Sequence, residues 1–318
     1  MITYVIRRLL MALVVLVLVS VVVFGAMRLL PGDPIRLIMA QSEIIAMDET
    51  ALQNLRHEFG LDRPVIVQYF SWVGGVLKGD FGTSIMSRGP VADEMWHRLP
   101  ITLHVGLLAF IIGVAIGIPA GIVCAVKRGK WADSFVTGMA NIGITVPVFW
   151  LGVMMMYLFA LRLKWLPTSG YTSPFDDFWL STRQLVMPVF CLALFPLAGT
   201  VRQTRSSMLE VLGQDYVRTA WSKGLKQRAV IMKHSLKNSL IPVVTLSGMQ
   251  LTMVVGGAVI VEQVFTIPGI GRYLITSINA QDYPAVQSVV LLIAIIVVVI
   301  NLLIDLSYGW LDPRIRYN

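Results

Sequence analysis

The sequence QDYVRTAWSKGLKQRAVIMKHSLKNSLIPV, residues 214–243, is a basic and helix-prone segment between two strongly apolar runs. Residues 214–223 favour a helix, and Gly224 interrupts it, as glycine commonly does just after a helix ends. Residues 226–239 favour a second helix that leads directly into the next apolar run. The segment therefore predicts two helices joined by a glycine turn, projecting from an apolar protein.

The composition is typical of a protein that crosses a membrane several times. Of the 318 residues, 56% are hydrophobic and 14% are charged, whereas soluble domains average about 25% charged residues. Six runs free of Asp, Glu, Lys and Arg approach or exceed the ~20 residues that a membrane-spanning helix needs: 9–27, 101–126, 134–161, 184–201, 239–261 and 283–304. Because backbone groups must be paired inside lipid, we expect an all-α polytopic membrane protein with six transmembrane helices.

Lysine and arginine are unevenly distributed between the two sides of these spans. If the N-terminus is cytoplasmic, the cytoplasmic side holds fifteen of them, in segments 1–8, 127–134, 202–238 and 311–318. The outer loops are longer and hold ten. Since positive residues collect in cytoplasmic loops, we expect both termini and the basic segment to be cytoplasmic.

The outer loop that follows the first span has helical spacing of its own. Leu52, Leu55 and Phe59 fall on one face, and residues 62–82 offer a second short helix closed by glycines. We expect a small external helical cap there. The predicted domain plan is an N-terminal transmembrane helix, an external region, a transmembrane core and a cytoplasmic tail, at residues 1–30, 31–100, 101–310 and 311–318.

The sequence lacks the motifs of the common catalytic sites. It has no G-x-x-x-x-G-K-[ST], no H-E-x-x-H and no G-x-S-x-G. Cys124 and Cys191 lie in apolar runs and are read as small hydrophobic residues. We predict no catalytic group and no metal site, so the chain is not expected to be an enzyme.

Charges inside the apolar runs are nearly missing. Arg28, Glu262 and Asp305 lie at the ends of runs, whereas ion-coupled carriers place ionisable groups near mid-membrane. This pattern favours transport powered by another chain. The alternatives are a self-powered secondary transporter or channel, and an intramembrane enzyme.

The basic segment offers an apolar ridge of Tyr216, Ala220 and Leu225. Basic residues surround the ridge: Arg218, Lys223, Lys226 and Arg228. Such a helix suits a groove on a partner protein. It equally suits an interfacial helix that rests on lipid, with its basic residues on anionic headgroups. The residues alone leave both interpretations open.

The segment resembles the coupling loop of bacterial ATP-binding-cassette (ABC) importer permeases, whose general pattern is E-A-A-x3-G-x9-I-x-L-P. Ala220 and Gly224 match that pattern, whereas Arg218, His234 and Lys237 depart from it. The form YVRTA-x-x-KG is similar to that of the dipeptide, oligopeptide and nickel permeases. Further stretches of the chain resemble the same subfamily: LPGDP, FGLDRPVIVQY, GDFGTSI, RGPVADEM, GGAVIVEQVFTIPGIGRYL and DYPAVQ.

The resemblance implies a type I ABC importer permease fold with a coupling loop at 214–238. It implies a permease subunit that takes up di- or oligopeptides across the bacterial inner membrane. Nickel, a metallophore complex or glutathione are alternative cargoes. The residues expected to contact the ATPase are Asp215, Tyr216, Arg218, Ala220, Gly224 and Leu225.

The implied partners are a second homologous permease, two ABC ATPase subunits, an extracytoplasmic solute-binding protein and membrane lipid. Nucleic acid is not among them. The chain itself is expected to bind no cofactor, because ATP and Mg²⁺ belong to the ATPase subunits. In the last external loop, a gate or scoop for substrate is predicted at Glu262, Phe265, Pro268, Gly269 and Gly271. A re-entrant turn packed for stability is the alternative for that loop.

Overall fold

The structure is a computed structural model that describes residues 2–29, 53, 56–57 and 59–311. Those residues are almost entirely helical, apart from loops and an isolated bridge between Thr83 and Pro90. They form two compact units. Unit 1 comprises Met1–Ile101 and Pro268–Val299, and unit 2 comprises Thr102–Ile267 and Ile300–Asn318. The domain boundaries expected from the sequence concern membrane topology and stay a prediction. Of the expected cap, residues 31–52, 54–55 and 58 lie outside the described part, so the predicted face of Leu52, Leu55 and Phe59 is not described.

Within the described part of the chain, five helical stretches are long and apolar enough to cross a membrane, or six if one bent pair counts as a single span. The expected all-α polytopic architecture is therefore confirmed. The principal helices of these five stretches are α1 (Ile2–Leu29), α5 (Val91–Val126), α8 (Phe178–Leu212), α11 (Leu236–Val264) and α13 (Tyr283–Leu311).

The bent pair replaces the continuous third span expected at 134–161. It consists of α6 (Trp131–Thr145) and α7 (Val148–Met155), and α7 continues as the π-helix η1 (Met156–Arg162). The helix direction bends by 102° between the two parts. Pro147 explains the break, because proline has no N–H to donate and disfavours the helical conformation in the residue before it. Val146 is accordingly extended, at φ −73° and ψ 125°.

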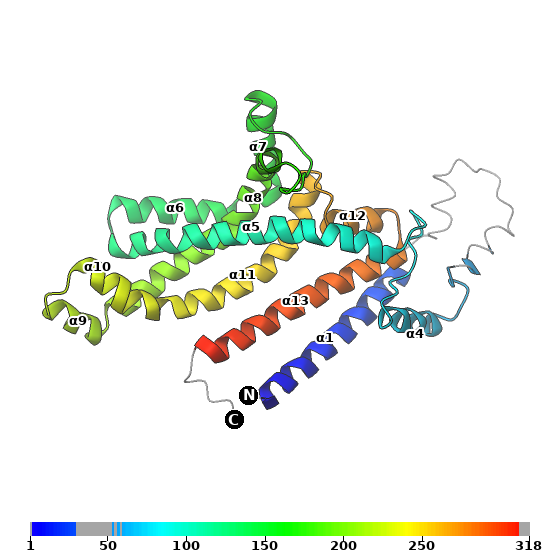
Figure 1. Cartoon of the computed structure of the whole chain (residues 1–318), viewed down its shortest axis with the longest axis horizontal. Helices are drawn as coiled ribbons and strands as arrows, with labels where there is room; N and C mark the ends of the chain where they lie inside the picture. Colours follow the sequence, from blue (N-terminus) through cyan, green and yellow to red (C-terminus); the bar gives the residue numbers. More distant parts are fainter. Residues whose placement is uncertain (1, 30–52, 54–55, 58, 312–318) are drawn as a thin grey trace. The chain divides into compact units, whose positions relative to one another are not determined.

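Unit 2 is built around α8, which packs against α6 and α11 (Figure 1). Three glycines of α5, spaced four residues apart, let this helix approach α8 closely. A methyl group added at Gly117 would lie 2.7 Å from Cβ of Thr200, and one at Gly113 would lie 2.9 Å from Pro196. Gly121 meets Thr204 in the same way. The four-residue spacing of these glycines therefore serves helix packing in this unit.

Short helices complete both units. In unit 2, α9 (Asp215–Ser222), α10 (Gln227–Ala229) and the π-helix η2 (Val230–Ser235) connect α8 to α11. In unit 1, α4 (Val65–Val76) packs against α1 through Tyr69, whose hydroxyl lies 2.9 Å from Ser20 Oγ. The last short helix, α12 (Ile270–Asn279), precedes α13.

Candidate functional site: the coupling surface around Gly224

The basic segment forms the predicted pair of helices joined by a glycine turn. Helix α9 ends at Ser222, and the Gly224 N–H donates to the carbonyl oxygen of Trp221 at 2.9 Å. Gly224 has φ +72°, in the left-handed backbone region that residues other than glycine rarely adopt. Lys226 then returns to extended geometry, at φ −61° and ψ 142°, and opens α10. The prediction of a glycine cap is confirmed.

A small apolar cluster holds α9 against the rest of unit 2. Val217 and Ala220 of α9 are buried together with Val230, and Val211 and Leu212 at the end of α8 pack against them. Val217 and Ala220 are three residues apart, so they share one face of the helix. The prediction that Ala220 belongs to an apolar ridge open to a partner is therefore wrong, because this side chain is 5% exposed and faces the cluster.

The outward side of the turn carries three large apolar side chains: Tyr216, Trp221 and Leu225 are 44%, 43% and 38% exposed. The Tyr216 hydroxyl accepts a hydrogen bond from Nδ2 of Asn238, at 2.9 Å, which ties α9 to the first turn of α11. Sequence reasoning missed Trp221. The signal that could have found it was a tryptophan within an otherwise basic segment, because exposed tryptophan is enriched at the centres of protein interfaces.

The charged residues of the turn point to solvent. Asp215 and Arg218 form an ion pair of 3.5 Å on side chains that are 97% and 73% exposed, and such pairs stabilise little. The basic side chains predicted to surround the ridge are all exposed: Arg218, Lys223, Lys226 and Arg228. We name Tyr216, Trp221 and Leu225 with these four basic residues the coupling surface.

The coupling surface is continuous with a long helix. Residues 227–264 run through α10, η2 and α11 without an interruption in helical structure. Within η2 the Ser235 hydroxyl donates to the carbonyl oxygen of Val230, at 3.1 Å. Figure 1 shows α9 and α10 at one end of the α8 and α11 pair. A movement of α9 would therefore reach α11 through the turn at Gly224 and then through the continuous helical backbone from Gln227 onward.

The predicted gate residues are largely buried. In unit 2, Glu262 is 0% exposed and accepts a hydrogen bond from Thr102 Oγ1 at 2.6 Å. Phe265, 2% exposed, lies against Gly152. In unit 1, Gly269 caps α12, Gly271 is buried in it, and Pro268 is half-buried. A gate role for these residues stays a prediction.

A second polar site in unit 1 was not found from the sequence. The carboxylate of Asp282, 2% exposed, accepts hydrogen bonds from the Ser84 hydroxyl and from the backbone N–H groups of Ile85 and Met86. Burial raises the pKa of the nearby Tyr273 hydroxyl to about 12, which keeps it protonated. This network ties the loop before α5 to the end of α12.

The described residues contain no group of three or more His, Cys, Asp and Glu side chains that could hold a metal ion. Cys124 and Cys191 are buried and unpaired with each other. The expectations that this chain binds no metal and no cofactor stay predictions.

The helical architecture and the apolar spans together define a polytopic membrane protein, and it exposes a basic turn. Residues 117–317 match the family described as binding-protein-dependent transport system inner membrane component, and residues 1–106 match its N-terminal family. The chain therefore belongs to this family of inner-membrane transport components. It is a non-catalytic, multi-pass component of a transport system.

Relatives match along the whole chain. A dipeptide transport system permease protein DppB of Alkalihalophilus pseudofirmus is 40% identical and covers 100% of both chains. The protein of the same name from Escherichia coli K12 is 39% identical, over 100% of this chain and 99% of its own length. A putative peptide transport system permease protein of Brucella abortus is 41% identical over 99% of both.

Solved structures share the fold. A chain of the inward-facing MetNI methionine ABC transporter matches with a TM-score of 0.57 and 18% identity, over 69% of this chain and 96% of that one. A chain of an amino acid ABC transporter matches with a TM-score of 0.52 and 14% identity, over 69% and 94%. The expected ABC importer permease fold is confirmed.

Proposed function

We propose that this chain is a permease subunit of an ABC importer that takes up di- or oligopeptides across the bacterial inner membrane. The observation that carries the proposal is the full-length similarity, at about 40% identity, to permeases named for dipeptide transport. Nickel, a metallophore complex and glutathione are the alternative substrates, and the test below compares nickel and glutathione with a dipeptide.

The proposed assembly contains a second homologous permease, two ABC ATPases and an extracytoplasmic binding protein. ATP and Mg²⁺ would be held by the ATPases. Both termini of this chain would be cytoplasmic, in keeping with the excess of Lys and Arg on that side. This proposed topology would put the coupling surface in the cytoplasm, where the ATPases would contact it.

The chemistry of the coupling surface supports contact with a protein groove. Tyr216, Trp221 and Leu225 offer exposed apolar and aromatic area, which anchors many protein interfaces. The surrounding Lys and Arg side chains fit a groove with acidic margins. The ATPase-contact role proposed from the sequence for Asp215, Tyr216, Arg218, Gly224 and Leu225 is kept. Buried Ala220 would act by positioning α9.

The proposed mechanism is alternating access. Closure of the ATPases on ATP would move α9, and the helical connection through η2 would carry the movement into α11. A ligand shifts a conformational equilibrium only by binding one state more tightly than the other. ATP would therefore act through the tighter fit of closed ATPases to one arrangement of the coupling surfaces.

The first test is transport in proteoliposomes. We expect ATP-dependent accumulation of a labelled dipeptide when the chain is reconstituted with its partner permease, ATPases and binding protein. Nickel and glutathione serve as comparison cargoes in the same vesicles. Nucleotide-independent accumulation by this chain alone would contradict the proposal. Preferential uptake of nickel or glutathione would assign that substrate to the transporter in place of peptides.

The second test maps the ATPase contact. A photo-crosslinking amino acid at Trp221 is expected to capture an ATPase subunit in the assembled transporter. The matched control is Trp179, at the start of α8, which is 69% exposed and lies at the other end of that helix. Equal capture of the ATPase from both positions would contradict the assigned surface.

A further inference from the structure

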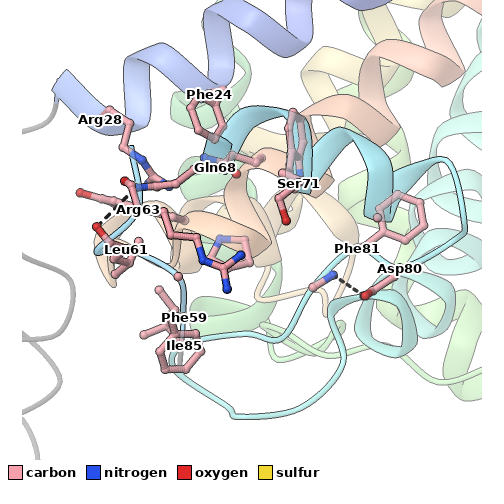
Figure 2. A pocket seen from close by; sticks show the side chains of 17 residues that line it. Phe24, Arg28, Phe59, Leu61, Arg63, Gln68, Ser71, Asp80, Phe81 and Ile85 are labelled. Carbon is pink, nitrogen blue, oxygen red and sulfur yellow. Dashed lines mark hydrogen bonds between the residues drawn. The ribbon is translucent and has the colours of Figure 1, made fainter. Parts of the chain in front are cut away.

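Unit 1 contains a cavity of about 230 Å³ that the transport proposal does not use (Figure 2). It lies between the end of α1, the helix α4, the loop before α5 and the start of α13. Aromatic side chains form much of its wall: Phe24, Phe59, Trp72, Phe81 and Tyr283.

Three lining residues carry buried N–H donors that have no acceptor among the residues that the structure describes. Nε and Nη1 of Arg28, Nε1 of Trp72 and Nε2 of Gln287 are all buried and unpaired. Gln287 is only 3% exposed. Folded proteins leave few buried polar groups unsatisfied. Because every unpaired atom of this set is a donor, the complementary ligand is a group with several acceptor oxygens.

The charge of the cavity favours an anion. Arg28 donates through Nη2 to Oε1 of Gln68, and no carboxylate of the described residues pairs with its guanidinium. Its position is fixed by the rings of Phe24 and Tyr283, whose centroids lie 4.8 and 4.9 Å from Cζ. Asp80, the one carboxylate among the described residues that line the cavity, accepts from the N–H of Gly82 and lies across the cavity from Arg28 (Figure 2).

The surroundings of the cavity match a lipid. Arg28 stands at the end of an apolar span, Val5–Leu29. Beside it, α4 is a short apolar helix with no buried residue, and Ile66 and Phe70 are 72% and 67% exposed. Such a helix suits the interface of a bilayer. Apolar area for acyl chains thus adjoins donors for an oxyanion.

We infer that this cavity binds the phosphate group of a phospholipid, with the acyl chains lying along α1 and α4. The phosphate oxygens would accept from Arg28, Trp72 and Gln287, three residues that come from three separate helices. Charge-assisted hydrogen bonds to phosphate are among the strongest in proteins. A free phosphate ion or a peptide carboxylate offers the same oxygens but makes no use of the apolar flank.

The test is lipid retention by the full-length chain, measured by native mass spectrometry after reconstitution in phosphatidylglycerol nanodiscs. We expect one retained phospholipid in the wild type. Arg28→Gln removes the cation, and Gln287→Glu places a negative charge against the phosphate. Each is expected to weaken retention by about tenfold or more, as the loss of a charge-assisted hydrogen bond predicts.

Trp72→Phe keeps an aromatic ring and removes only the Nε1 donor. We expect it to weaken retention by roughly threefold to tenfold, less than Arg28→Gln, because it removes one hydrogen bond from a neutral donor and leaves the cation in place. The matched control is Trp131→Phe, at an exposed position at the start of α6 in unit 2, which is expected to retain lipid like the wild type. Monodispersity and thermal unfolding identify any variant that fails to fold, and Trp72→Phe and Gln287→Glu keep the test decisive if Arg28→Gln is lost.

The comparison arms separate the possible ligands. Nanodiscs that contain diacylglycerol, which lacks the phosphate, are expected to leave the cavity without retained lipid. Equal retention of diacylglycerol would overturn the inference, as would unchanged retention in all three variants, which would mean that water satisfies the donors. Displacement of the lipid by millimolar inorganic phosphate or by a dipeptide would also overturn it, in favour of a soluble anion.

Discussion

Helices α9 and α12 are both short and lie outside the long apolar spans, but they are held in different ways. In unit 2, α9 rests on two buried side chains, Val217 and Ala220, and exposes its aromatic residues. In unit 1, α12 buries Ile270, Gly271 and Ser277 and is followed by the buried Asp282 network. Helix α9 therefore lies on the surface of its unit and keeps exposed side chains for contact, whereas α12 is part of the core of its unit.

The largest expected effect tests the α12 side of this comparison. Asp282→Ala removes an acceptor of one hydroxyl and several backbone N–H groups, and it leaves these donors buried. We expect a loss of about 4 kcal/mol in the free energy of unfolding, since each unsatisfied buried donor costs ~1–3 kcal/mol. Chemical or thermal unfolding of the reconstituted protein measures it.

The control is the aspartate at the start of α9. Asp215→Ala removes a side chain that is 97% exposed, and surface changes of this kind shift stability by less than about 0.5 kcal/mol. Equal destabilisation by the two substitutions would contradict the distinction between the two helices.

A second substitution tests how α9 is attached. Val217→Asp places a carboxylate in the cluster with Val230 and Leu212, and we expect a local loss of about 3 kcal/mol because that charge has no partner there. Hydrogen exchange should become fast over 215–223, and ATP-dependent uptake should be lost. The rest of the protein should unfold at nearly the wild-type temperature.

Thr219→Asp supplies the same charge on the exposed side of the same helix. It should leave hydrogen exchange of α9 close to that of the wild type. Protection of α9 in Val217→Asp would show that the cluster does not hold the helix.

A third comparison uses two glycines with the same backbone conformation. Gly224 and Gly129 have φ +72° and +73°, and neither has an atom within 4 Å of an added Cβ. Gly224→Leu and Gly129→Leu should therefore each cost about 1–2 kcal/mol through the left-handed backbone alone. Only Gly224→Leu should also uncouple ATP hydrolysis from uptake, because only this turn belongs to the coupling surface.

Membrane insertion and uptake per ATP hydrolysed are the measurements for the two glycine variants. Intact coupling in Gly224→Leu, or equal uncoupling in both, would remove the reason to assign a mechanical role to the turn.

The smallest effect is expected for Tyr216→Phe. The substitution removes one half-exposed hydrogen bond, from Asn238 to the tyrosine hydroxyl, and should cost no more than about 1 kcal/mol. Uptake should stay near the wild-type rate because the ring remains available for contact. A large loss of uptake would mean that the tether to α11, rather than the exposed ring, carries the coupling.

Much of the architecture could be predicted from the sequence. Each apolar run gave a helix, because the length and hydropathy of a span are local properties. The third run, expected as one continuous span, is the exception, because Pro147 divides it into two helices. Gly224 was placed correctly because a left-handed helix cap is specified by the glycine itself. Trp221 and Ala220 were misjudged, since the order of residues does not say which face of α9 would find the end of α8.

The sequence by itself determined the membrane-spanning helices, the glycine turn and the family to which the chain belongs. Only the tertiary structure decided that Glu262 is buried against Thr102, and that Asp282 closes a loop nearly two hundred residues earlier in the chain. It alone brought Arg28, Trp72 and Gln287 to one cavity. The physical reason is that helix formation depends on neighbours along the chain, whereas a buried polar site depends on which distant segments pack together.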